Sequence, residues 1–197
     1  MSPKRQTVPR LAIVMFLSLF ISGCGVNTIP TREEQAKAAW SDVQNQYQRR
    51  AELIPNLVET VKGFAQQERT VLTEVTQARA KATQVQINAD QLTDPEALRR
   101  FQEAQAQLSG ALGRLLAVSE QYPDLKSNQN FLSLQSQLEG TENRIAVARR
   151  DYIQAVQAYN TEVRTFPGRF WAVVYGAKPM ATFTTTEENQ RAPQVHF

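Results

Sequence analysis

The chain has 197 residues, with 22 Lys or Arg against 19 Asp or Glu, so its formal net charge of +3 does not indicate a nucleic-acid-binding surface. A single cysteine, Cys24, excludes an internal disulfide. A single histidine, His196, stands next to the last residue and disfavours a catalytic triad or a zinc site, because both need a positioned imidazole.

The first 23 residues are typical of a bacterial lipoprotein signal peptide. Basic residues precede an apolar run at 11–20, and Ser22 and Gly23 stand directly before Cys24. We predict cleavage between Gly23 and Cys24, acylation of the Cys24 thiol, and a lipidated tether at 24–30. The alternative is an uncleaved anchor. It is weaker because the apolar stretch has 13 residues and a spanning helix needs roughly 20.

Removal of the signal peptide would change the charge balance. Lys4, Arg5 and Arg10 would be lost, which leaves 19 basic against 19 acidic residues. A lipoprotein is expected in the bacterial cell envelope, facing the periplasm or the exterior. Gly25, rather than aspartate, follows Cys24 and favours the outer membrane where the envelope has two membranes.

Residues 31–183 are predicted to form one helical domain. A capping box at Thr31 and Glu34 indicates the first helix start. Behind it, apolar residues at spacings of three and four form a heptad-like seam, as in coiled-coil packing. Pro55 lies inside the seam. The helix either kinks there and continues to about residue 87, or ends near Leu53 with Pro55 opening a new helix.

Polar residues around Pro55 form the one candidate polar site. Glu52, Asn56 and Glu59 share a face if the helix continues, and they could bind a cation at the kink. The competing interpretation is structural. In it, Glu59 pairs with Lys62, Glu52 pairs with Arg49, and Asn56 satisfies the backbone carbonyl that proline leaves free.

Charged and aromatic residues on the seams need separate explanations. Arg50 and Glu68 fall on seam positions, so each either finds a partner across the bundle or lies at its rim with its stem on apolar surface. Trp40, Phe170 and Trp171 either pack in the core or lie at a membrane-proximal end.

Helix-capping and helix-breaking residues predict where the later helices begin and end. Asp94 or Thr93 with Pro95 starts a second helix, which ends at Tyr122 before a proline. Gly110 and Gly113 inside it indicate close approach of another helix. A third stripe starts at Ser127 or Asn128 and ends at the Pro167–Gly168 pair. Residues 170–175 are expected to form a helical turn or a packed segment, and 184–197 a disordered tail.

These stripes together predict an all-α fold. Three to four long amphipathic helices with short connections bury their apolar faces most simply against one another, as an up-and-down antiparallel bundle.

Several segments closely resemble the LemA family. They are Trp40 and the runs 48–64 (QRRAELIPNLVETVKGF), 122–126 (YPDLK), 139–145 (EGTENRI), 158–161 (AYNT) and 165–167 (TFP). The resemblance implies a bundle of about four helices at the bacterial envelope, a link to membrane organisation, and no established enzymatic activity. The chain departs from the family in having a lipoprotein-type N-terminus in place of a transmembrane anchor, and Ile153 where asparagine usually follows the tyrosine.

The sequence therefore predicts a membrane-anchored, non-enzymatic helical scaffold or interaction module in membrane organisation. The alternative is a regulatory subunit of a membrane protease or transporter. The expected partners are membrane lipid, through acylated Cys24, and unidentified envelope proteins. We expect no nucleic acid, small-molecule substrate, cofactor, metal or catalytic residue.

Overall fold

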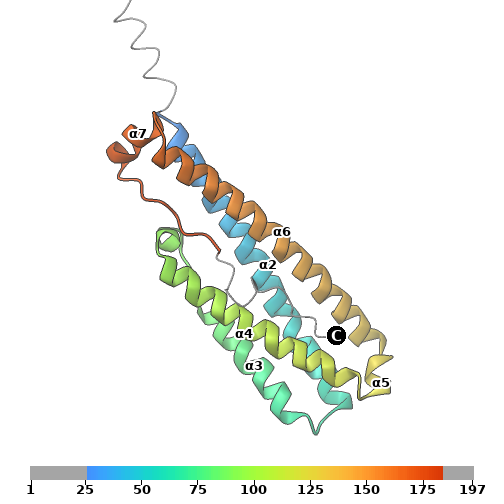
Figure 1. Cartoon of the computed structure of the whole chain (residues 1–197). Coiled ribbons are helices and arrows are strands. Elements are labelled where there is room, and N and C mark those ends of the chain that lie inside the picture. Colours follow the sequence, from blue (N-terminus) through green and yellow to red (C-terminus); the bar gives the residue numbers. More distant parts are fainter. Residues whose placement is uncertain (1–25, 184–197) are drawn as a thin grey trace, which may run out of the picture.

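The structure is a computed structural model that describes residues 26–183, and the all-α prediction is confirmed (Figure 1). The four long helices are α2 (Thr28–Phe64), α3 (Arg69–Gln84), α4 (Pro95–Ser119) and α6 (Gln129–Arg164). Three short ones are η1 (Ala89–Thr93), α5 (Pro123–Lys126) and α7 (Gly168–Tyr175). No strand occurs within 26–183, and none of the helices in that range combines the length and the hydropathy that a membrane-spanning segment needs.

The long helices lie side by side in an elongated rod (Figure 1). Helix α2 packs along α6, and α3 packs on α4 and on the second half of α2. Figure 1 shows the chain reversing direction at each connection. It also shows α7 beside the start of α2 at one end of the rod, with α5 at the other end. These two ends are called the α7 end and the α5 end below.

The core divides into two apolar clusters along the rod. The cluster nearer the α7 end includes Trp40, Tyr47, Phe101, Ile145 and Tyr152. The cluster nearer the α5 end includes Ile54, Leu57, Leu108, Leu115 and Leu138. On α2, α4 and α6 alike, the change from one cluster to the other falls at the level of Arg50.

Helix α2 begins earlier than predicted. It starts at Thr28, with Asn27 at the N-cap, so Thr31 lies inside the helix and the predicted capping box does not form there. Residues 28–30, expected to belong to the tether, are therefore helical. Ile29 explains the extension: its side chain is 1% exposed, and burying it stabilises an additional first turn.

The predicted continuation of the helix through Pro55 is confirmed, whereas both predicted helix ends, near Leu53 and near residue 87, are wrong. Helix α2 passes through Pro55 and ends at Phe64, and α3 begins at Arg69 after a turn at 65–68. A single helix to residue 87 would extend beyond the neighbours that cover its seam. The turn instead folds α3 back, so that Leu72 and Val75 are buried in the same cluster as Leu57.

The predicted starts of the later helices are confirmed. The Asp94 carboxylate accepts from the Glu96 N–H at 2.9 Å, with Pro95 as the first helical residue of α4. The Asn128 side chain accepts from the Phe131 N–H at 3.1 Å and caps α6. Residues 170–175 are helical, within α7, as one of the two predictions had it.

The prediction for Gly110 and Gly113 is wrong. A Cβ at Gly113 would meet no atom within 4 Å, and one at Gly110 would meet only the Arg114 side chain. No atom of another described helix lies within 4 Å of a Cβ at either position, so both glycines weaken α4 without a packing benefit. Gly113→Ala is expected to raise the free energy of unfolding by about 0.5–1 kcal/mol, measured by urea denaturation.

A matched Gly168→Ala variant should do the opposite. A Cβ on Gly168 would clash with the Glu162 carbonyl oxygen, so the backbone would have to move to make room. Equal stability changes for the two variants would contradict this account of α4.

Candidate functional site

The three polar residues predicted around Pro55 lie on one exposed face of α2, because the helix continues through Pro55. Glu52, Asn56 and Glu59 are all exposed on the outer face of α2. Glu52 accepts from the Gln48 side chain at 3.0 Å, and Glu59 lies 3.5 Å from the Lys62 amine. Within 26–183, no group of three or more His, Cys, Asp or Glu side chains could hold a metal ion.

The carbonyl that Pro55 leaves free finds a donor on another helix. Proline has no N–H, so the carbonyl of Ala51, four residues earlier, lacks its helical partner. Arg79 of α3 donates its Nε–H to that oxygen at 2.7 Å. The predicted donor, Asn56, is exposed and does not take this role. A buried carbonyl beside Pro55 thereby becomes a contact that holds α3 against α2.

This contact predicts a specific coupling between Arg79 and Pro55. Arg79→Ala is expected to cost about 1–2 kcal/mol, because the Ala51 carbonyl loses its donor. In a Pro55→Ala background the alanine N–H satisfies that carbonyl, so the same arginine substitution should cost less. Urea unfolding of the four proteins of this double-mutant cycle checks the difference. An equal loss of unfolding free energy in both backgrounds would show that Arg79 stabilises the fold through packing of its aliphatic stem and not through its hydrogen bond to the Ala51 carbonyl.

The most buried charge lies between the two apolar clusters. The Arg50 side chain is 1% exposed and reaches from α2 to both α4 and α6. Its Nη1 donates to Glu142 Oε1 at 2.7 Å and to Ser109 Oγ at 2.9 Å, and its Nη2 donates to Gln105 Oε1 at 2.6 Å. We call Arg50, Gln105, Ser109 and Glu142 the Arg50 layer.

The Arg50 layer satisfies most of its own polar atoms. Gln105 Nε2 donates to the Ala82 carbonyl at 3.3 Å, which extends the network to α3. The guanidinium carbon lies 5.0 Å from the centre of the Tyr47 ring, a cation–π contact. Arg50 Nε is buried and has no hydrogen-bond partner among the described residues. The geometry resembles a structural cross-link that joins α2 to α4 and α6.

Of the two predictions for Arg50, the partner across the bundle is confirmed. Glu142 lies in the run EGTENRI and Arg50 in the run QRRAELIP, so two of the segments that carry the family resemblance meet in this layer. Glu68 is half-buried and accepts from the Tyr122 hydroxyl at 3.0 Å, which links two further segments of the chain.

An aromatic cluster and a C-terminal strap complete the α7 half of the rod. Trp40 is 2% exposed, and its Nε1 donates to the Ile87 carbonyl at 3.1 Å, so its core placement is confirmed. The strap is the segment 176–183. Tyr152 donates to its Ala181 carbonyl at 2.9 Å, and Asn160 donates to the Met180 carbonyl and accepts from the Met180 N–H.

Burial of tyrosine hydroxyls predicts a loss of stability at alkaline pH. Burial raises the pKa of Tyr152 above its usual value near 10, and that of Tyr47 and Tyr159 in the same direction. The unfolded chain therefore loses these protons first as pH rises. The resulting stability is complete below about pH 10 and falls above it. Urea midpoints should stay level between about pH 8 and pH 10 and decline above about pH 10, and Tyr152→Phe should flatten that decline.

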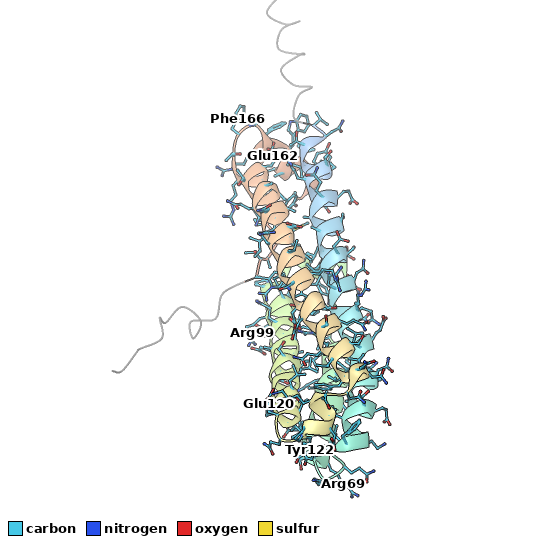
Figure 2. All side chains as sticks on the ribbon, turned by 90° about the vertical axis from the view of Figure 1, so that its right-hand side faces the viewer. Arg69, Arg99, Glu120, Tyr122, Glu162 and Phe166 are labelled. Carbon is cyan, nitrogen blue, oxygen red and sulfur yellow. The ribbon has the colours of Figure 1, made fainter. Side chains whose placement is uncertain are left out.

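Helix α7 exposes apolar side chains at one end of the rod. Gly168 and Ala172 face inward, whereas Phe170 is 61%, Val173 80% and Val174 60% exposed. Phe166, just before the helix, is 89% exposed. Figure 2 shows Phe166 at the end of the rod opposite Tyr122 and Arg69. Of the two predictions for Phe170, core packing is wrong; Trp171 is half-buried against the core.

The predicted lipid site lies outside the described residues. Gly23 and Cys24 belong to 1–25, and the predicted tail begins at residue 184. The sequence analysis identified neither the partners of Arg50 nor the outward face of α7. A charged residue on the apolar seam was the signal that could have pointed to a buried polar network. The unbroken apolar run at 170–175 was the signal that could have pointed to an exposed apolar face.

Comparisons with known proteins agree on one family. The model of the LemA family matches residues 39–197. A magnetosome protein MamQ of Paramagnetospirillum magneticum is 27% identical, over 85% of this chain and 67% of its own length. MamQ of Magnetospirillum gryphiswaldense is 25% identical, over 88% and 69%. Protein LemA of Metamycoplasma hominis is 24% identical over 71% of this chain, which spans 60% of that relative.

Proposed function

The chain belongs to the LemA family, and from that premise we propose that it is a lipid-anchored protein of the bacterial cell envelope. Its up-and-down antiparallel helical bundle acts as a non-enzymatic interaction module in membrane organisation. Its partners are the membrane lipid that receives acylated Cys24 and envelope proteins that bind the outer helix faces.

The observation that carries this proposal is the start of α2. It begins at Thr28, four residues after Cys24, and it begins at the end of the rod. A fully extended link of that length spans about 14 Å at most. Acyl chains on Cys24 would therefore hold the α7 end close to the bilayer and direct the α5 end away from it. One acyl chain gives marginal binding, so the several chains of a mature lipoprotein suit stable attachment.

The surface supports binding rather than a reaction centre. The outer faces of α2 and α4 carry local ion pairs such as Lys37 with Glu33 and Arg99 with Glu96. Surface pairs of this kind add little stability and leave a mixed-charge surface available to other proteins. That some relatives are magnetosome proteins by name is in keeping with a role at a specialised membrane.

Fractionation of cells that express wild type or Cys24→Ala tests the anchor. Wild-type protein is expected in the membrane fraction, with a mass that lacks residues 1–23 and includes acyl groups. Cys24→Ala is expected to keep its signal or to leave that fraction. Native protein with residues 1–23 intact and no acyl group would overturn the attachment.

Photocrosslinking in intact membranes tests the interaction module. A crosslinker at exposed Leu132 of α6, near the α5 end, is expected to capture a defined envelope protein. A crosslinker at Gln66, in the turn between α2 and α3, provides a second position at the same end. Repeated absence of any protein adduct from both positions would contradict a scaffold role.

A further inference from the structure

Helix α7 has an unusual distribution of apolar side chains. Its sequence GRFWAVVY is apolar nearly all round, and a helix of that kind is normally buried in a core or in a membrane. Within 26–183, its inner face, with Ala172 and part of Trp171, is the face that contacts the rest of the rod. Phe170, Val173 and Val174, at positions i, i+3 and i+4, form a second face that no described residue covers.

These side chains form one surface, which we call the apolar end: Phe166, Phe170, Val173, Val174 and Tyr175. Soluble monomers rarely keep large apolar patches open, whereas single exposed apolar residues are ordinary. The patch also has aromatic character, since the Phe170 ring packs edge-on against Trp171 at 5.2 Å between centroids. Aromatic rings of this kind concentrate where a bilayer meets water.

The place of the apolar end identifies what would cover it. It lies at the end of the rod where α2 begins, so a lipid on Cys24 would bring it to the bilayer surface (Figure 1). A short link of about 14 Å leaves little room for this end to turn away from the membrane.

The charges around the apolar end fit an anionic lipid surface. Arg164, Arg169 and Lys178 are exposed around α7, and none of them forms a salt bridge among the described residues. Of the nearby acidic residues, Glu33 and Glu34 are paired with Lys37, and Glu162 lies against Gly168 at the start of α7, so the three basic residues are partly balanced by one carboxylate. Basic residues near a membrane surface attract anionic headgroups.

We propose that the apolar end inserts into the headgroup region of the bilayer, as a second membrane contact beside the Cys24 anchor. The inference rests on the proposed anchoring at Cys24. Phe170, Val173 and Val174 enter the boundary with the acyl chains, and Arg164, Arg169 and Lys178 meet lipid phosphates. An interfacial helix of this kind lies about 5–10 Å deep, without crossing the bilayer.

The test uses the full-length lipoprotein in vesicles of phosphatidylcholine with phosphatidylglycerol. An environment-sensitive fluorophore is attached to Val173→Cys, and in a matched control to Leu132→Cys, an exposed apolar position near the α5 end. The Val173 probe is expected to shift to the blue and to be quenched several-fold by brominated lipid. The Leu132 probe should stay unquenched, with a spectrum typical of water.

Further variants test the headgroup contact. Arg164→Gln, Arg169→Gln and Lys178→Gln together should reduce quenching of the Val173 probe, and phosphatidylcholine alone should give less quenching than the anionic mixture.

A Val173 probe as unquenched as the Leu132 probe would overturn the insertion. A blue shift that appears without lipid and rises with protein concentration would show a second copy on the apolar end. Crosslinks from position 173 to residues 11–23 would show that an uncleaved signal covers it.

Labelling of the wild-type protein separates failure of this inference from failure of the anchor. An acylated Cys24 takes up no thiol label, whereas a free Cys24 takes up one. An unlabelled wild type with an unquenched Val173 probe refutes the insertion and keeps the anchor. A labelled wild type refutes the anchor, and the Val173→Cys probe is then read in a Cys24→Ser background, where position 173 is the one thiol that takes up the fluorophore.

Discussion

Replacement of Arg50 with alanine is expected to lower the free energy of unfolding by about 3 kcal/mol. Arg50 is 1% exposed and fills the space between the two apolar clusters, so truncation opens a cavity there. It also removes the donors bound by Gln105 Oε1 and Ser109 Oγ. Glu142, with a side chain 48% exposed, can return to solvent, so its charge adds little to the loss.

Three further substitutions separate volume from charge in the Arg50 layer. Arg50→Met keeps most of the volume and should recover part of the loss. Glu142→Gln should cost about 1 kcal/mol or less, because a half-exposed pair is screened by water. A cycle of Arg50→Ala with Gln105→Ala should be strongly non-additive, since the two share one network. Urea unfolding followed by circular dichroism measures all of them. A loss below about 1 kcal/mol for Arg50→Ala would show that the layer relaxes without cost.

Trp40→Ala is expected to cost about 3–5 kcal/mol, the largest effect of any substitution considered. Its ring lies between 5.2 and 6.0 Å from the rings of Tyr152, Phe101 and Phe183, measured between centroids. The substitution removes these contacts from three separate segments of the chain. It also leaves the Ile87 carbonyl with one donor, Gln44, in place of two.

Phe170→Ala is the matched control for Trp40→Ala. It also truncates an aromatic side chain, but one that is 61% exposed, so the stability should change by no more than about 0.5 kcal/mol. Trp40→Phe should fall between the two, because it keeps the ring contacts and loses the hydrogen bond. A Trp40→Ala protein as stable as Phe170→Ala would contradict the central place of the aromatic cluster.

Local signals predicted the helix starts that depend on a few neighbouring residues. Asp94 with Pro95, and Asn128, each carry the donor or acceptor of the cap within three positions of the start. The turn at 65–68 has neither glycine nor proline within it, so the pattern gave no break there. The turn forms because it lets α3 bury its apolar face against α2 and α4, and these contacts between helices cannot be read from the residues of the turn itself.

The partners of buried polar groups were harder to predict. Gln105 and Glu142 lie 55 and 92 positions from Arg50, and only the tertiary arrangement brings them together. The outward placement of Glu52, Asn56 and Glu59 follows from the seam itself. Ile54, Leu57 and Val61 are buried, so the residues between them point to solvent. The strap at 176–183 carried no periodic signal, since it is held by backbone groups bound by Tyr152 and Asn160 and by two separate buried side chains, Met180 and Phe183.

The Arg50 layer also fixes how the helices are aligned along the axis of the rod. Heptad-like seams allow one helix to slide by a whole repeat against its neighbours with apolar residues still facing apolar residues. Such a slip would place the Arg50 guanidinium among leucines, away from Gln105 and Glu142, at a cost of several kcal/mol. The helices therefore hold one longitudinal alignment. Helix α6, with 36 residues, then works as a spacer of about 54 Å between the two ends of the molecule.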